Sequence, residues 1–375
     1  MTRAVVAAPA GGGGVAAAPP VRADLVLATG GTGGHVFPAL AVAREAVASG
    51  LTPVVLGARG GLEERVAAEA GLGFVGVSAG KWDRGRPSPV QAARAAAGLA
   101  EAYLALRRLR PRVVVGFGGF ASFPGAAAAT RLRVPLVLHE GNAYPSAVNR
   151  WLASRAELVI VAQEEALAHL RDVRRSLVVP FPVREERVPR AEARAALGLP
   201  PDAVVTLVMG GSQGSATLNR EAPRAYREVG PQAPGGAPHH VVHAAGPGRA
   251  GEVDAADLPL YHVREFVDAV VAWSAADLAV TRAGMGTLSE AAFHGVPLVM
   301  VPLPSAADDH QLHNARAVAA AGAGVVVEEK EVSRLGSAWR SLLAPEARAA
   351  AAAAAARRTP AGAARRILCA VQELA

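Results

Sequence analysis

From residue 24 onward, short apolar segments alternate with longer segments in which apolar residues recur at helical spacing. This alternation is typical of βα units, in which each strand of a parallel sheet is followed by a helix. The predicted strands are, in chain order, Leu25–Ala28, Pro53–Leu56, Phe74–Val77, Val113–Val115, Leu136–Leu138, Leu158–Val161, Val204–Met209, His240–His243, Tyr261–Val263, Leu278–Val280, Leu298–Val301 and Gly324–Val327. The pattern therefore predicts an α/β fold.

A proline-rich break at Pro180–Pro182 separates two series of these strands. Each series opens with a strand that runs directly into a glycine-rich turn, Gly30–His35 in the first and Gly210–Ser215 in the second. We therefore expect two doubly wound halves joined near residue 183. The expected domains are a flexible extension over 1–23, a first Rossmann-like domain over 24–183, a second over 184–357, and a C-terminal helix over 358–375 that either completes the second half or packs back on the first.

The composition fits two folded domains and leaves the ligand open. The chain has 375 residues, enough for two hydrophobic cores, and its 51% hydrophobic content excludes a disordered chain. Lys and Arg exceed Asp and Glu by 39 to 32, a net charge of +7. A positive surface attracts diphosphates, anionic lipid headgroups or nucleic acid, and charge alone does not choose among them.

The single cysteine, Cys369, excludes an intramolecular disulfide framework and a cysteine-based metal cluster, so we expect a reducing compartment. The apolar segments are short and interrupted by Pro, Gly or Arg. No membrane span is predicted from them, and any membrane contact would be peripheral.

The first glycine-rich turn, Gly30–His35, lets the backbone turn sharply and approach a phosphate or a sugar closely. It lacks the spacing of a dinucleotide fingerprint and the ending of a P-loop, which disfavours hydride transfer and ATP hydrolysis. A tight turn needed only for packing is the alternative.

His35 lies in the first turn of the following helix, predicted over Phe37–Ala48, where a neutral imidazole could accept a proton from a hydroxyl. Alternatively, His35 only donates a hydrogen bond to a loop or to substrate.

Further polar or glycine-rich segments follow other predicted strands. Gly116–Gly125 and His139–Pro145 follow strands of the first half, and Thr281–Glu290 begins a helix in the second. Because ligands gather at the carboxyl ends of parallel strands, we expect these segments to contact substrate. Glu290 could bind ribose hydroxyls or be an ordinary first-turn glutamate. The consecutive residues Asp308-Asp309-His310 are not expected to bind a metal ion, because consecutive residues rarely converge on one ion.

Taken in order, these segments resemble the MurG family of bacterial glycosyltransferases from about Leu25 to the C-terminal tail. The motifs that carry the resemblance are Ala28–Ala39, Gly116–Phe120, His139–Asn142, Pro182–Arg184, Gly210–Gly214, Arg282–Gly284 and Ala307–Gln311. The resemblance implies a GT-B fold, in which two Rossmann-like domains face a cleft. It also implies inverting transfer of N-acetylglucosamine from UDP-N-acetylglucosamine to the 4-hydroxyl of undecaprenyl-diphospho-N-acetylmuramoyl-pentapeptide in peptidoglycan synthesis.

Carried onto this sequence, the resemblance assigns residues of the first half to the sugar. It implies that Thr32, Gly33, Gly34 and Asn142 line the wall that faces it. In the inverting displacement, the acceptor hydroxyl attacks the anomeric carbon from the face opposite UDP, and His35 is the expected base.

The resemblance assigns the nucleotide mainly to the second half. Arg184 and Ser212 would approach the diphosphate, Val267 would border the uracil, and Gln311 would contact sugar hydroxyls. The residues expected to hold phosphate and ribose are Met285, Gly286, Thr287, Leu288, Ser289 and Glu290. Helix dipoles and Arg184 can stabilise the departing UDP without a divalent cation, so neither a metal nor another cofactor is expected.

The sequence departs from the family pattern at two places. Gly141 stands where the family often has Gln, which removes a polar contact, and Pro180-Phe181 stands where it has Gly-Asn, which stiffens the hinge. Neither departure removes a residue assigned to binding.

Two basic segments, Lys81–Arg86 and Tyr103–Arg110, combine cations with aromatic and apolar residues. We expect them to rest on the anionic cytoplasmic face of the cell membrane as a peripheral contact, where other cell-wall synthesis proteins could also dock. The alternative is an ordinary solvated helix face.

Three other functions compete with the transferase. A UDP-sugar epimerase of the same fold needs a pair of carboxylates at one sugar carbon, and no such pair stands out. A non-catalytic, membrane-associated subunit that binds nucleotide sugars is disfavoured because both glycine-rich halves are in one chain. A nucleic-acid partner is not expected, because no recognition motif accompanies the charge.

Overall fold

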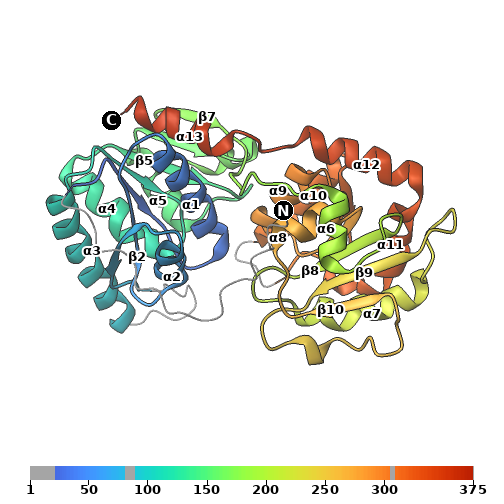
Figure 1. The fold of residues 1–375 in the computed structure, drawn as a ribbon. Helices are drawn as coiled ribbons and strands as arrows, with labels where there is room; N and C mark the ends of the chain where they lie inside the picture. Colours follow the sequence, from blue (N-terminus) through green and yellow to red (C-terminus); the bar gives the residue numbers. More distant parts are fainter. Residues whose placement is uncertain (1–21, 81–88, 305–308, 375) are drawn as a thin grey trace, which may run out of the picture. The chain divides into compact units, whose positions relative to one another are not determined.

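The computed structural model describes residues 22–80, 89–304 and 309–374, which form two parallel β-sheets and the helices that pack on them (Figure 1). The strand order is β3-β2-β1-β4-β5-β6-β7 in the first sheet and β10-β9-β8-β11-β12-β13 in the second. The expected extension up to residue 21, the basic segment Lys81–Arg86 and the pair Ala307-Asp308 lie outside the described residues.

The first sheet has seven strands and follows the predicted βα alternation. Its strands are β1 Leu25–Ala28, β2 Pro53–Ala58, β3 Gly73–Val77, β4 Val113–Gly116, β5 Leu136–Glu140, β6 Leu158–Val161 and β7 Ser176–Val178. Its helices are α1 Gly33–Ala48, α2 Leu62–Glu69, α3 Pro89–Leu109, α4 Phe123–Leu132 and α5 Ala147–Leu152, with 3₁₀ turns at Phe120–Ser122, Ala153–Arg155 and Glu164–His169. Every predicted strand is present, and β7 is an additional one that the apolar pattern does not reveal.

The second sheet has six strands and repeats the design. Its strands are β8 Val204–Met209, β9 His239–Ala244, β10 Tyr261–Arg264, β11 Leu278–Thr281, β12 Leu298–Met300 and β13 Gly324–Val326. Its helices are α6 Arg190–Leu197, α7 Ala216–Val229, α8 Ala269–Ala275, α9 Met285–His294, α10 His310–Ala320, α11 Leu335–Leu343 and α12 Pro345–Arg357, with 3₁₀ turns at Ala250–Glu252 and Glu329–Arg334. Helix α13 Ala363–Gln372 follows α12 along the chain.

Both sheets are doubly wound. In the first, β1 pairs in parallel with both β2 and β4, and in the second β8 pairs in parallel with both β9 and β11. The winding direction reverses at β1/β4 and at β8/β11, and at such a switch point the loops after the strands diverge and leave room for a ligand. The inner strands of both sheets are buried, whereas the edge strands β3, β7, β10 and β13 are partly exposed. In the second sheet Trp273 lies in the core on one face and Trp339 in the core on the other.

Contacts along the chain divide it into two compact units, residues 1–137 with 374–375 and residues 138–373. This division falls inside β5, so the domain boundaries expected at 183/184 and 357/358 stay predictions. Within the second unit, Arg366 Nη2 of α13 donates to the Val178 carbonyl at 3.2 Å, and α13 lies beside β7 (Figure 1).

Candidate active site

The first glycine-rich turn joins β1 to α1 in the first unit. Gly30 and Gly31 have φ values of +145° and +92°, which only glycine adopts readily. Helix α1 begins at Gly33, earlier than the predicted Phe37, and Thr32 is its N-cap residue without a side-chain capping bond. The first helical N–H groups of Gly33 and Gly34 therefore point out of the turn without an intrahelical acceptor.

His35 is held in this turn by two threonines. Thr29 Oγ1 donates to the His35 carbonyl at 2.7 Å, and Thr32 Oγ1 lies 3.0 Å from His35 Nδ1. If Nδ1 carries the proton and donates to Thr32, Nε2 keeps the lone pair that a base requires. The structure thus brings Thr32 and His35 together in an arrangement compatible with proton transfer through Nε2.

The segment after β5 is organised by a buried carboxylate. Strand β5 extends to Glu140, so His139 and Glu140 lie within the strand and are buried, whereas the sequence predicts them after it. Glu140 Oε1 accepts from the N–H and Nδ2 of Asn142 at 2.9 and 3.1 Å, and Oε2 accepts from Ser146 N–H at 2.7 Å and Asn149 Nδ2 at 3.0 Å. Burial raises the pKa of Glu140 above its usual value, and these bonds partly oppose the rise.

Asn142 is further engaged by Asn314, a residue of α10 to which the sequence analysis assigns no role. Asn314 is completely buried and donates from Nδ2 to Asn142 Oδ1 at 3.4 Å and to the Ala283 carbonyl at 3.3 Å. Its Oδ1 accepts from Ala143 N–H and from Gln163 Nε2, both at 3.3 Å. These residues all belong to the second unit. Both polar atoms of the Asn142 amide have protein partners, so its contact with a sugar stays a prediction.

The second glycine-rich turn joins β8 to α7, and a buried arginine supports it. Arg282 Nε donates to Oγ of Ser215, the N-cap residue of α7, at 2.9 Å. Arg282 Nη1 donates to the carbonyls of Val301 and Pro302 at 3.1 and 3.3 Å and to Glu329 Oε2 at 2.6 Å. Arg282 therefore fixes this turn to the carboxyl ends of β11 and β12, while Ser212 remains exposed at its tip.

Helix α9 begins at Met285, as the predicted phosphate site requires. A Cβ placed on Gly284, Gly286 or Gly211 would meet no atom of the described residues within 4 Å. The unpaired N–H groups at a helix N-terminus bind anions. Gln311 Oε1 accepts from the N–H groups of Ala283 and Leu303 at 3.2 and 3.1 Å, which joins the loops after β11 and β12.

Glu290 lies one turn farther along α9. Trp273 Nε1 donates to its Oε2 at 3.0 Å, and burial raises the pKa of Glu290 to about 7. The group is therefore present in both protonation states near neutral pH, and each state can hydrogen-bond a hydroxyl. Its contact with ribose stays a prediction.

Arg184 and Val267 lie on connections of the second unit. The Arg184 guanidinium is exposed, forms an ion pair with Glu186 and lies 3.9 Å from Asp268 Oδ2. The bond to Glu186 raises the pKa of Arg184. Val267 follows Phe266, whose side chain is 74% exposed.

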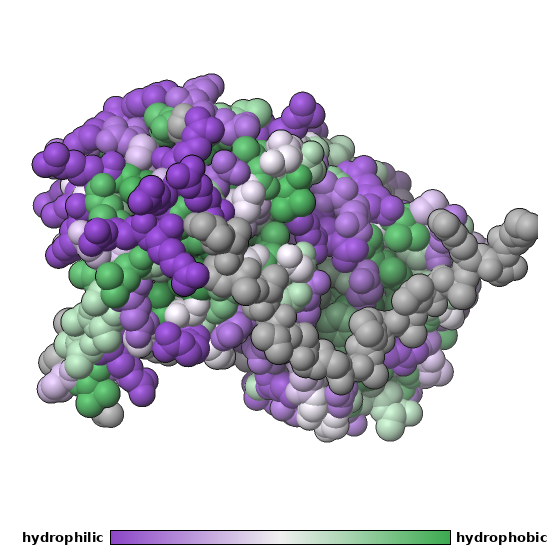
Figure 2. Space-filling view, turned by 60° about the vertical axis from the view of Figure 1, so that its left-hand side comes forward, coloured by the Kyte–Doolittle hydropathy of each residue, from purple (hydrophilic) through white to green (hydrophobic). Residues whose placement is uncertain are grey.

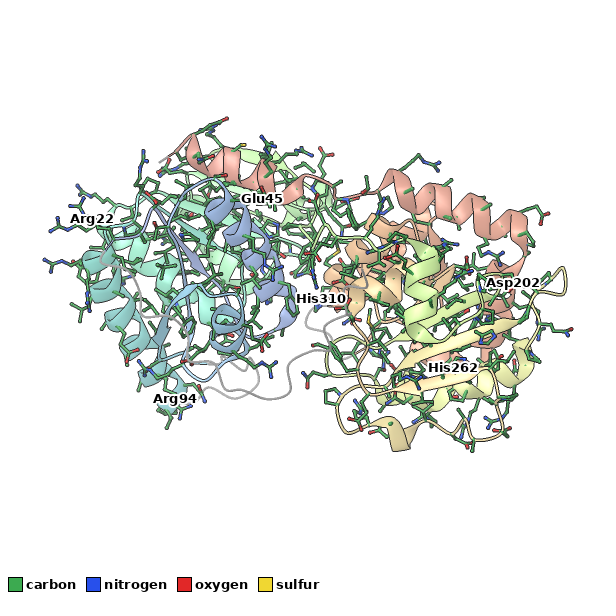
Figure 3. All side chains as sticks on the ribbon, in the orientation of Figure 1. Arg22, Glu45, Arg94, Asp202, His262 and His310 are labelled. Atoms are coloured by element: carbon green, nitrogen blue, oxygen red, sulfur yellow. The ribbon has the colours of Figure 1, made fainter. Side chains whose placement is uncertain are left out.

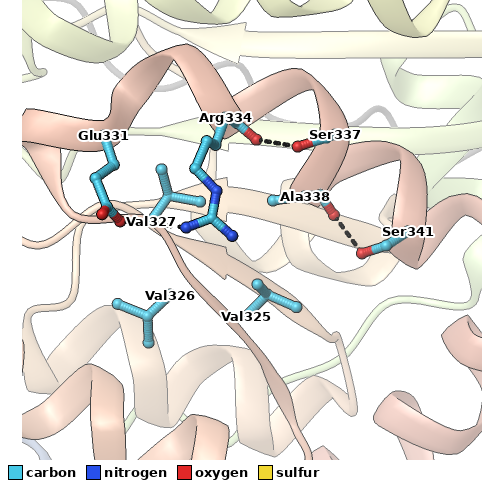
Figure 4. A pocket seen from close by; sticks show the side chains of 8 residues that line it. All are labelled: Val325, Val326, Val327, Glu331, Arg334, Ser337, Ala338 and Ser341. Atoms are coloured by element: carbon cyan, nitrogen blue, oxygen red, sulfur yellow. Dashed lines mark hydrogen bonds and ion pairs between the residues drawn. The ribbon is translucent and has the colours of Figure 1, made fainter.

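No group of three or more His, Cys, Asp or Glu side chains that could bind a metal occurs in the described ranges. A cavity of about 230 Å³ opens between β13 and α11 and is lined by Val325, Val326, Val327, Glu331, Arg334, Ser337, Ala338 and Ser341 (Figure 4). It contains none of the predicted site residues.

Known proteins resemble the chain along most of its length. Residues 25–161 match the glycosyltransferase family 28 N-terminal domain, and residues 205–367 match the family's C-terminal domain. A Deinococcus radiodurans protein is 47% identical over 91% of this chain and 93% of its own length. A Thermus thermophilus protein is 43% identical over 80% of this chain and 87% of its own length. Both are named UDP-N-acetylglucosamine–N-acetylmuramyl-(pentapeptide) pyrophosphoryl-undecaprenol N-acetylglucosamine transferase.

Two solved structures superpose on this chain along most of its length. The crystal structure of Acinetobacter baumannii MurG superposes with a TM-score of 0.74 at 27% identity and covers 93% of this chain and 99% of its own. A Listeria monocytogenes structure described as a putative UDP-N-acetylglucosamine 2-epimerase superposes with a TM-score of 0.68 at 16% identity and covers 93% of this chain and 96% of its own. At that identity the second likeness concerns the fold alone.

Proposed function

The chain belongs to glycosyltransferase family 28, and we propose that it transfers N-acetylglucosamine from UDP-N-acetylglucosamine to the 4-hydroxyl of undecaprenyl-diphospho-N-acetylmuramoyl-pentapeptide, with inversion at the anomeric carbon. Its two parallel sheets form a GT-B fold. The observation that carries the proposal is the match to both family 28 domains in one chain, together with relatives of that name at up to 47% identity over most of its length.

The donor chemistry suits the second sheet. When the glycosidic bond to UDP breaks, negative charge develops on the diphosphate, and helix N-terminal amides and cations stabilise it. At the N-terminus of α9, a Cβ on Gly284 or Gly286 would meet no atom of the described residues within 4 Å, and the turn with Ser212 lies after the neighbouring strand β8. To bind the diphosphate, Arg184 would leave its ion pair with Glu186 and form one with the ligand instead.

For the acceptor, His35 is the proposed base. The acceptor hydroxyl loses its proton as it attacks, and His35 Nε2 would accept that proton while Nδ1 stays beside Thr32 Oγ1. Thr32, Gly33 and Gly34 would line the wall that faces the sugar. The epimerase and the binding subunit receive no support from the curated relatives, which are named as transferases.

We also propose that the first unit rests on the cytoplasmic face of the membrane, which would deliver a lipid-linked acceptor in two dimensions. In the described part of the chain no helix is long and apolar enough to cross a membrane. Helix α3 exposes Val90 and Leu104, at 61% and 64%, together with Arg94, Arg107 and Arg108. Arg94 is labelled on α3 in Figure 3, and the face of the molecule drawn in Figure 2 carries hydrophobic side chains beside hydrophilic ones.

The direct test is UDP release from UDP-N-acetylglucosamine with a short-chain lipid-linked acceptor, measured with and without excess chelator. Acceptor-dependent release that survives chelation supports a metal-independent transferase. Release without acceptor, or none at all, contradicts it. A His35→Ala variant, which we expect to lose about 100-fold or more in kcat as general-base variants do, tests the assigned base separately.

A further inference from the structure

Glu63 is a buried carboxylate directly beneath the first glycine-rich turn. It lies near the start of α2 with 1% of its surface exposed. Its Oε1 accepts the Ala58 N–H at 2.7 Å, which anchors the carboxylate to the end of β2. No basic side chain in the described ranges forms an ion pair with it. The sequence motifs of the turn give no indication of this residue.

Three glycines leave the space that the Glu63 side chain occupies. A Cβ on Gly30 would lie 2.0 Å from Glu63 Oε1, one on Gly57 would lie 2.4 Å from Cγ, and one on Gly61 would lie 2.7 Å from Cδ. Gly30 also has the φ of +145° that shapes the turn. The turn and the carboxylate are therefore fitted to each other, and a shift of one displaces the other.

The same contacts continue to His35. The Gly30 carbonyl oxygen and His35 Nδ1 both border Gly119, at 2.3 and 3.0 Å from the position of a Cβ there. Thr32 and Thr29 then bind His35 directly. Glu63 thus supports, through Gly30, the segment that holds the assigned base.

The second carboxylate oxygen, Oε2, is buried and has no hydrogen-bond partner among the residues that the structure describes. A buried polar atom without a partner is costly, and native proteins keep few of them. The free acceptor therefore indicates a partner that arrives during the reaction cycle.

We propose that Glu63 is a positioning residue of the transfer reaction. Oε1 holds the end of β2, and Oε2 accepts a hydrogen bond from a backbone N–H of Gly30–His35 when the acceptor binds and the turn tightens. The residue acts through the turn and does not touch substrate. This inference rests on the proposed function, because it concerns the step in which the turn receives the acceptor.

The test compares wild type with Glu63→Gln, which keeps the volume but replaces one oxygen with a donor. We expect kcat to fall about 100-fold, the loss associated with a misplacement of roughly 1 Å, while the KM for the donor and the thermal midpoint stay close to wild type. The matched control is Glu64→Gln on the same helix, because Glu64 is partly exposed to solvent beside the helix start and accepts the Gly60 N–H there. It should keep the wild-type kcat.

A measurement on the wild type keeps the inference testable if the variant does not fold. Amide hydrogen exchange in the peptide that spans Gly30–His35 should slow when an acceptor analogue is added, and should not slow with the donor alone. An unchanged exchange rate, or a Glu63→Gln variant with wild-type kcat, overturns the role of Glu63. If wild type itself releases no UDP with acceptor present, the proposed function fails instead.

Discussion

The two glycine-rich turns follow equivalent strands of their sheets, but the side chains that support them have opposite charges. The first lies over the Glu63 carboxylate, which has one oxygen without a hydrogen-bond partner among the described residues. The second is tied to the Arg282 guanidinium, which donates to Ser215, to two strand-end carbonyls and to Glu329. A support with several hydrogen bonds to the turn and the strand ends holds its turn before a ligand arrives, whereas a carboxylate oxygen without a described partner leaves the first turn able to adjust. We infer that the second turn is preorganised and that the first turn adjusts when a ligand binds.

The largest effect is expected from removing Arg282, the side chain that supports the second turn. Arg282→Ala removes one hydrogen-bond donor from the Ser215 hydroxyl, from the carbonyls of Val301 and Pro302 and from Glu329, and we expect the free energy of unfolding to fall by about 3 kcal/mol. Urea unfolding measures the change. Arg316→Ala breaks the exposed pair with Glu328 and should cost less than about 1 kcal/mol. Equal effects of the two variants contradict the assigned support.

Glu140 offers a test in the second unit that does not involve a glycine-rich turn. Glu140→Ala leaves the donors of Asn142, Ser146 and Asn149 unpaired, and we expect a loss of about 2 kcal/mol in unfolding free energy. Calorimetry measures it against Glu164→Gln, an exposed glutamate whose replacement should stay within about 0.5 kcal/mol. A Glu140→Ala protein as stable as wild type would show that this carboxylate does not organise the segment.

Two buried histidines of the second sheet should make stability depend on pH. Burial lowers the pKa of His239 and of His243 to about 4, against an ordinary value of 6.5. Between these values the unfolded chain binds protons that the folded chain does not, so each histidine stabilises the fold fully above pH 6.5. That contribution is lost as the pH falls to 4, by about 1.4 kcal/mol per pH unit and per histidine. Thermal midpoints measured between pH 4 and 7 should fall with falling pH.

Glu290 should change the stability of the fold with pH in the direction opposite to the two histidines. Its pKa of about 7 in the folded chain lies above the ordinary 4.5, so its stabilising contribution is full below pH 4.5 and is lost as the pH rises to 7. Glu290→Gln removes this opposing slope, and its stability should rise more steeply with pH than that of wild type, by about 1.4 kcal/mol per unit. Parallel curves for the two proteins would contradict the raised pKa.

The smallest expected effect concerns the membrane face of the first unit. Arg107→Gln and Arg108→Gln should each weaken binding to anionic vesicles by about 1 kcal/mol and leave binding to neutral vesicles unchanged. Cosedimentation measures both. Arg334→Gln, on an exposed arginine of the second sheet, is the control. If the control weakens binding as much as the α3 variants, the proposed face is wrong.

The apolar pattern predicts both sheets because buried parallel strands are apolar throughout. It misses β7, a three-residue edge strand with Ser176 and Val178 exposed. It also places the start of α1 too late, since Gly33 and Gly34 have low helix propensity and the surrounding turn overrides it. Glu63 and Asn314 escape sequence analysis for another reason: their partners Gly30 and Asn142 are distant in sequence and meet them only in the folded chain.

The central claim, that this chain joins N-acetylglucosamine to a lipid-linked muramoyl-pentapeptide, is tested most directly by identifying both products of one reaction. Mass spectrometry and NMR of the acceptor after incubation with UDP-N-acetylglucosamine should show one added N-acetylglucosamine in β linkage on the 4-hydroxyl, in amount equal to the UDP released. An unmodified acceptor, UDP released without transferred sugar, or an epimerised UDP-sugar would contradict it.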